Sequence, residues 1–376
     1  DLQSVEHRGA TVRAMVTLEQ ARFHLARNKI DESERLIRRC VLQYQDLTGV
    51  SAAGESHIEF GLTQLAAGRV VEAREYFHMA RSDPGYDFDA LNRIRSRALE
   101  GVAAFLYGNY TLAFEMADSA GNDARSAAVR DWELFALFLQ GRVYHELGRY
   151  ESATAIFETG RRVASEAAHS EAEAVITKWL ARAMTGCGDT SGALSLLELY
   201  GSDPETSFFA AEAYELAGAP DKAVSVLEQR KQVSSHRMRP ILSVRWSNGF
   251  DGIEAMADAI QAQEIVDRLC RAFHGYLVAR QGDVDAAVNE LRACSREQRH
   301  VSLDPNAPLV LYWYAMSLPK ERDSRYDDPA TELGKSVNLI QQRVARTDDA
   351  HEKNDYRTRN RWYRRVFESA RQYNLA

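Results

Sequence analysis

The chain has 376 residues, 27% of them charged and 45% hydrophobic, and a formal net charge of −7. This acidic balance argues against a general nucleic-acid binder, whose binding surface would be basic. No apolar run approaches the roughly 18 residues of a membrane span. The length alone would suggest about two or three globular domains, but an internal repeat overrides that expectation.

The first 203 residues read as five helical hairpins, over residues 1–49, 50–85, 86–125, 126–165 and 166–203. In the first hairpin the apolar stripe comprises Met15, Leu18, Leu25, Leu36 and Ile37. Each hairpin has a small residue in the middle of its first helix, and these residues are spaced by 40: Ala21, Gly61, Gly101, Gly141 and Ala181. Chance does not produce such a spacing, so we interpret the segment as a repeat array.

The fourth hairpin shows the pattern most clearly. Gly141 and Ala153 face each other across a turn at Gly148, and Phe157 lies one helical turn beyond Ala153. This order of residues resembles the tetratricopeptide repeat, whose usual period is about 34 residues. The resemblance implies an all-α, right-handed α-solenoid of stacked antiparallel helix pairs, with about seven or eight repeats. The six additional residues per repeat predict longer helices or longer loops.

Beyond residue 203 the regularity weakens. Asp203-Pro204 predicts the start of a helix, and the spacing from Ala181 to the next small residue, Ala211, is only 30. We therefore predict a repeat array over 1–233, a divergent segment over 234–274, and further repeats with capping helices over 275–376. The divergent segment carries Pro240, Trp246 and Gly252, and both a hinge and a decayed repeat remain open for it.

The C-terminal part predicts a loop at Asp304-Pro305, an aromatic helix that ends at Pro319, and a helix over residues 329–344. A last helix from His351 carries aromatic residues together with Arg357, Arg359, Arg361, Arg364 and Arg365. Because a solenoid needs an end helix with one polar face, we interpret this last helix as the cap.

The sequence offers no pattern for catalysis, a metal or a cofactor. Residues 186–192 form a glycine-rich turn, but a helix precedes it and no Lys-Ser/Thr pair follows it, as a phosphate-binding loop requires. No His-Glu-x-x-His pair occurs, and the four cysteines lack metal-site spacing. We interpret the cysteines as buried thiols and expect a protein that is not an enzyme.

The resemblance also implies a binding surface, because the first helices of such repeats line the concave face of the solenoid. Carried onto this chain, the concave positions give an apolar floor next to a basic ridge, followed by an acidic stretch. The candidate partner-binding residues are Phe105, Phe135, Phe138, Arg142, Lys178, Arg182, Phe208 and Glu212. Exposed aromatic residues of this kind usually mark a partner site.

The favoured hypothesis is a scaffold that binds a protein or peptide within a larger assembly, for which a bacterial envelope or motility complex is a candidate. One alternative is a peptide-sensing regulator. The other is nucleic-acid binding through residues 351–376, where arginine and aromatic residues interleave. With no initiating Met and no signal sequence, we expect a fragment of a longer polypeptide and leave cytoplasm and periplasm open.

Overall fold

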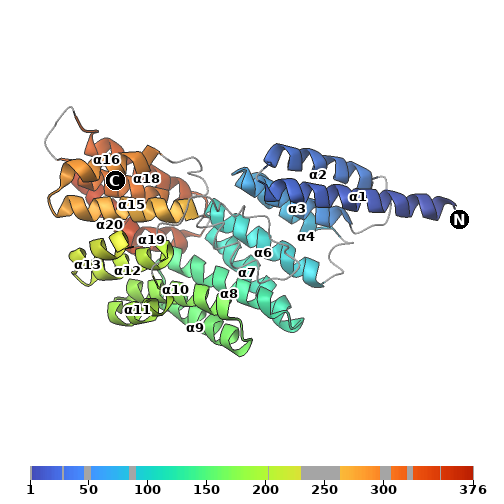
Figure 1. The fold of residues 1–376 in the computed structure, drawn as a ribbon, viewed down its shortest axis with the longest axis horizontal. Helices are drawn as coiled ribbons and strands as arrows, with labels where there is room; N and C mark the ends of the chain where they lie inside the picture. Colours follow the sequence, from blue (N-terminus) through green and yellow to red (C-terminus); the bar gives the residue numbers. More distant parts are fainter. Residues whose placement is uncertain are drawn as a thin grey trace. The chain divides into compact units, whose positions relative to one another are not determined.

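The computed structural model describes residues 2–27, 29–45, 52–83, 90–201, 203–229, 263–296, 306–319, 325–347 and 349–375. Within these ranges the regular secondary structure is entirely helical (Figure 1). The prediction of an all-α fold is therefore confirmed. The predicted loop at Asp304-Pro305 and residues 234–262 of the divergent segment lie outside the described residues.

The chain forms two compact units. Of the described residues, the first unit contains those within 2–107 and 112–139, and the second contains those within 108–111, 140–229 and 263–375.

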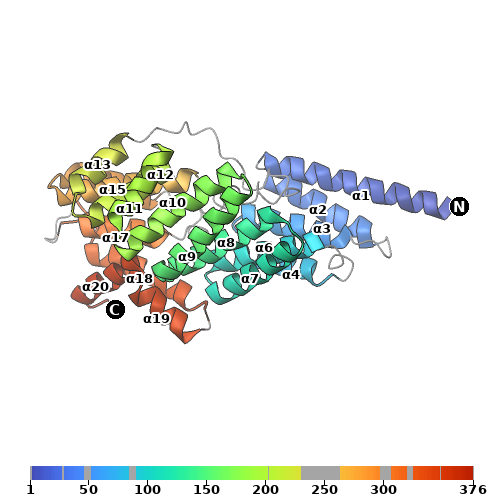
Figure 2. The same cartoon turned by 90° about the horizontal axis from the view of Figure 1, so that it is seen from below.

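The helices of the first unit follow one another as the predicted pairs. Helix α1 packs against α2, α3 against α4, and α4 against α6, and α1 runs beside α2 in both ribbon views (Figures 1 and 2). The bounds are α1 Leu2–Ala26, α2 Ile30–Gln45, α3 Ala52–Ala66, α4 Val70–Arg81, α6 Ala90–Tyr107, α7 Tyr110–Ser126 and α8 Arg130–Glu146. The first two residues of α7 and the residues of α8 after 139 belong to the second unit.

The second unit continues the pairs and then adds the C-terminal helices, of which α20 lies beside α18 and α19 (Figure 2). Its helices are α9 Tyr150–Glu166, α10 Ser170–Cys187, α11 Thr190–Leu197, α12 Pro204–Leu216, α13 Pro220–Gln229, α15 Gln263–Arg280, α16 Val284–Arg296, α17 Ala307–Ser317, α18 Pro329–Val344, α19 Ala350–Thr358 and α20 Arg361–Gln372, with a short 3-10 helix at Glu198–Tyr200.

The repeat geometry explains both the conserved spacing and the period of 40. Helices α8 and α9 have 17 residues each, so the longer period comes from longer helices, with short connections between them. A Cβ atom at Gly141 would overlap the ring of Phe157, and one at Gly61 would overlap the ring of Phe77. The small residue is therefore needed for close helix packing, and the turn glycine Gly148 has a left-handed φ of 71°.

The prediction of one last helix from His351 is wrong, because this segment forms two helices. Helix α19 ends at Thr358, and Asn360 begins α20 as its N-cap. The Asn360 side chain accepts hydrogen bonds from the backbone N–H groups of Trp362 and Tyr363 at 3.1 and 3.2 Å. This cap satisfies N–H groups that a new helix leaves unpaired, so the chain can turn there.

Candidate functional site

The sequence-derived groove residues are not exposed as expected. The three phenylalanines of the apolar floor, Phe105, Phe135 and Phe138, are at most 2% exposed. Trp132 meets Phe135 edge-on, with ring centroids 5.3 Å apart. The expectation of an exposed aromatic floor is therefore wrong, because these rings belong to the hydrophobic core.

The charged groove residues of the second unit form a buried cluster. Arg182 contacts Glu212 at 2.9 Å, and each side chain is only 5% exposed. The guanidinium of Arg142, fully buried, stacks 3.6 Å from the centroid of the Trp179 ring. Phe208 is also buried and lies beneath Arg182, 5.4 Å from its guanidinium carbon. The structure thus brings these four predicted residues together, but inside the protein.

Burial sets the protonation properties of this cluster. Desolvation lowers the pKa of Arg142 to about 10, although Glu146 partly opposes the shift. Desolvation also lowers the pKa of His145 well below its ordinary value, and the nearby Arg182 and Arg142 lower it further. His145 is therefore neutral at pH 7, and it contacts the Trp179 ring edge-on at 5.5 Å.

The cover over this cluster is helix α20 of the same chain. The indole N–H of Trp362 donates to the Glu212 carboxylate at 2.7 Å. Arg361 and Arg365, on the same helix, pair with Glu215 at 2.5 and 3.1 Å. The side-chain amide of Asn360 donates to the backbone carbonyl of Glu146 at 2.9 Å. The predicted cap therefore covers the face that the sequence analysis assigned to a partner.

Lys178 is the exception among the eight predicted groove residues. Its side chain is 17% exposed and its ammonium pairs with Asp203 at 3.0 Å. Asp203 also caps α12 by accepting hydrogen bonds from the backbone N–H groups of Glu205 and Thr206. The other seven predicted groove residues are buried. Partner binding by the eight residues stays a prediction.

An open apolar surface lies instead on the first two helices. Met15, predicted to belong to the packed stripe, is 56% exposed, whereas the other four members of the stripe are buried. On α1 it is joined by Val12, Val16 and Phe23, which are 57%, 51% and 54% exposed. Together these four side chains, here called the α1 stripe, line a hollow of about 1310 Å³ that also includes residues of α2.

Half of the exposed large hydrophobic side chains in the described residues belong to this stripe. Scattered single apolar residues are normal on a protein surface, but a contiguous group within a hollow usually marks an interaction site. The sequence signal was present, because α1 carries apolar residues on two faces. One face packs against α2 through Ala14, Leu18 and Ala21, and the second face is the stripe.

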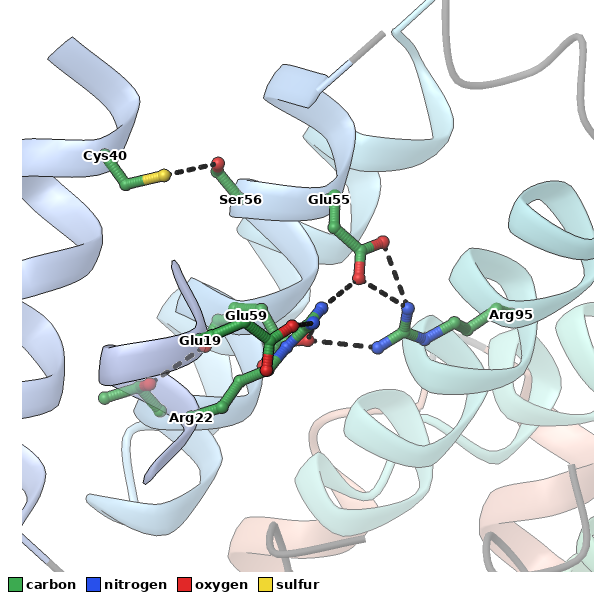
Figure 3. Close-up of polar contacts among 8 residues, drawn as sticks. Glu19, Arg22, Cys40, Glu55, Ser56, Glu59 and Arg95 are labelled. Carbon is green, nitrogen blue, oxygen red and sulfur yellow. Dashed lines mark hydrogen bonds and ion pairs between the residues drawn. The ribbon is translucent and has the colours of Figure 1, made fainter. Parts of the chain in front are cut away.

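Arg22 and Glu55, which line the hollow, belong to a polar network (Figure 3). Arg22 of α1 pairs with Glu55 and, at 2.8 Å, with Glu59 of α3. Arg95 of α6 approaches the same two carboxylates at 2.9 and 3.1 Å. Burial would lower the pKa of Arg22, but Glu59 and Glu55 raise it above its ordinary value. The network joins the first helices of three successive repeats and holds Arg22 and Glu55 fixed at the edge of the hollow.

The described residues contain no cluster of three or more His, Cys, Asp or Glu side chains suited to a metal ion. In the same ranges, none of the helices combines the length and the apolar character needed to span a membrane. The cysteines differ from the prediction at one position, since Cys187 is exposed while the other three are buried.

Repeated helix pairs with a small mid-helix residue and a left-handed turn glycine give this chain the helical-repeat fold seen in tetratricopeptide-repeat proteins, as predicted. A family model described as a tetratricopeptide repeat matches residues 134–159. Another, named TP_0123_C and described as a C-terminal domain, matches residues 255–374.

Solved structures share the fold at low sequence identity. A tetratricopeptide repeat protein from Parabacteroides merdae is 11% identical and superposes with a TM-score of 0.56. The alignment covers 81% of this chain and 99% of that one. A Rap protein, complexed with Competence and Sporulation Factor, is 10% identical, with a TM-score of 0.50 and coverage of 96% and 98%. No curated protein sequence matches the chain.

Proposed function

We propose that the protein is a non-catalytic scaffold that binds a partner protein through the hollow lined by the α1 stripe. The tetratricopeptide-like fold generally serves protein–protein interaction, and it is typical of proteins without catalytic activity. The observation that carries the assignment to this surface is the group of four apolar side chains, each more than half exposed, on one helix. Burying them against a partner would be favourable by about 25 cal/mol per Å² of apolar area.

The polar network supports the same surface. Arg22 and Glu55 line the hollow, and their ion pairs to neighbouring repeats restrict the side chains before a partner arrives. A surface that is already ordered loses less conformational entropy on binding. An apolar patch bordered by fixed charges is also the usual anatomy of a specific interface.

The test is affinity capture with the full chain as bait, followed by quantitative mass spectrometry. A Val16→Asp/Phe23→Asp variant places two carboxylates in the stripe and should lose the captured partner. Leu199→Asp is the matched control, because Leu199 is 73% exposed but lies far along the chain on another element. Equal partner recovery by both variants and the unaltered chain would argue that the stripe is not the binding surface.

A peptide-sensing regulator is the second candidate, and the position of α20 favours it. The helix contacts α12 through the polar contacts of Trp362 with Glu212 and of Arg361 with Glu215, as a ligand segment would. The Rap protein, whose structure has a similar fold, is complexed with Competence and Sporulation Factor. If a peptide competes with α20, a Trp362→Ala variant should bind that peptide more tightly than the unaltered chain does, measured by titration calorimetry.

Nucleic-acid binding through residues 351–376 has less support. Stacking on bases requires exposed aromatic rings, but Trp362 and Tyr363 are only 5% and 2% exposed. Arg361 and Arg365 are already paired with Glu215.

A further inference from the structure

The residues of the α1 stripe have counterparts in every later repeat of the 40-residue array. Val16 corresponds to Ser56, Ser96, Ala136 and Ile176, all of which are at most 1% exposed. Phe23 corresponds to Thr63, Ala103, Val143 and Ala183, which are equally buried. In α1 the same two positions are 51% and 54% exposed. These two positions of the stripe are therefore buried wherever another repeat precedes them.

The helix that covers this face in later repeats is the second helix of the preceding repeat. Helix α2 packs on α3, where the thiol of Cys40 lies 3.5 Å from the Ser56 hydroxyl. Helix α4 packs on α6, where Arg81 pairs with Glu100 at 2.8 Å. Helix α9 packs on α10 in the same way. The stripe therefore corresponds to the face on which the second helix of a preceding repeat would pack.

The charges around the hollow define the complementary helix further. Arg35 and Arg39, one turn apart on α2, are exposed and line the same hollow. Neither forms a hydrogen bond or ion pair with another described residue, whereas Arg22 is already paired with Glu19, Glu55 and Glu59. Like charges at this spacing repel each other, and carboxylates facing them would remove that repulsion.

We propose that the hollow binds an amphipathic α-helix of a partner protein, which packs on α1 as an added second repeat helix and places acidic residues against Arg35 and Arg39. This inference rests on the proposed function and specifies the partner's chemistry. The apolar face of the added helix would cover the stripe, and its acidic flank would run along α2. Such a helix continues the array in trans with the packing that the chain already uses between its own repeats.

The first experiment maps what touches the stripe. A photo-crosslinking amino acid is placed at Val16 of the full chain, with Leu199 as the control position, and the protein is expressed in its native cells. Adducts at position 16 should map to one segment of a partner that has apolar residues at helical spacing and flanking Asp or Glu. Adducts to a second copy of this chain, to another part of the same polypeptide, or to a segment without that pattern would overturn the inference.

The second experiment tests the charges by partner capture. Arg35→Glu and Arg39→Glu should each reduce partner recovery at least about tenfold, since each would oppose an acidic flank. Arg38→Glu is the matched control, because Arg38 is exposed on the same helix and pairs with Glu34 but does not line the hollow. Equal effects at all three positions would refute the acidic helix.

The two proposals fail in distinguishable ways. If Val16→Asp/Phe23→Asp abolishes capture but the adduct maps to a non-helical segment, the surface is correct and the added-helix inference is wrong. If capture is insensitive to the stripe variants, both proposals fail together.

Discussion

The buried pair of Arg182 and Glu212 allows a sharp test of how α20 is held. We consider Glu212→Gln, which keeps the size of the side chain and its acceptor oxygen for the Trp362 indole N–H but removes the negative charge. Burial acts to lower the pKa of Arg182, and the Glu212 carboxylate more than offsets it, so that the pKa is raised. Without the carboxylate, a guanidinium that is 5% exposed loses its counter-charge.

Removal of one partner from a buried ion pair typically costs about 3–5 kcal/mol. For a unit of this size, about 3 kcal/mol corresponds to a decrease in Tm of about 6–12 °C. The measurement is urea unfolding of the full chain followed by tryptophan fluorescence, with the free energy of unfolding extrapolated to water. Lys178→Met is the control, because Lys178 is in a more exposed pair with Asp203 and its loss should cost about 1 kcal/mol or less.

A double-mutant cycle separates the ion pair from other effects of the substitution. Arg182→Met in the Glu212→Gln background removes the uncompensated charge and should restore at least about 2 kcal/mol. Helix α20 should also exchange amide hydrogens faster in Glu212→Gln, because Trp362 bonds to the altered side chain. If Glu212→Gln is no more destabilising than Lys178→Met, the burial argument for this cluster is wrong.

Three further predictions concern single positions. In thermal unfolding, Gly148→Ala should be more destabilising than Gly188→Ala by about 2 kcal/mol or more. Both glycines have a left-handed φ, so both substitutions strain the backbone. At Gly148 the new Cβ would also collide with the backbone of Arg359 and Asn360, whereas nothing lies within 4 Å at Gly188. Lowering the pH from 7 to 5 should destabilise the unaltered chain more than the His145→Gln variant, because the imidazole takes up a proton in the unfolded state but not in the folded state, where burial lowers its pKa. The difference in the free energy of unfolding should reach up to about 1.4 kcal/mol per pH unit below about 6.5. Urea midpoints of both proteins at both pH values check this. In a thiol titration of the native protein with Ellman's reagent, Cys187 should react first and Cys187→Ser should remove the fast phase, because Cys187 is exposed and the other three cysteines are buried.

The repeat architecture could be predicted from the sequence because it depends on local, periodic constraints. Gly141 must be small to admit Phe157, and Gly148 must accept a left-handed backbone, so both features recur in the residue pattern. The helix starts at Asp203-Pro204 and over residues 329–344 follow from equally local capping rules. These parts of the prediction were confirmed, because contacts between residues close in the sequence determine them.

The candidate groove could not be predicted in the same way. The positions of Arg142, Arg182 and Glu212 on the inner face of their helices were inferred from an open solenoid, and nothing local indicates that Trp362, 150 residues later, covers Glu212. The stripe on α1 was missed for the opposite reason. In the sequence, Val16 and Phe23 look like ordinary core residues, and their counterparts in the later repeats are indeed buried.

The contact between Asn360 and the carbonyl of Glu146 joins residues 214 positions apart, and it affects how the second unit is assembled on the ribosome. Ordinary repeat arrays fold progressively, because each hairpin needs only its neighbours. Here Trp179 and Arg182 emerge long before α20 is translated, so nascent chains must carry an unfinished, aromatic-lined face for more than 170 further residues. Because α20 covers this face only late in synthesis, we expect chaperones to bind the helix pairs around Trp179 before α20 is made.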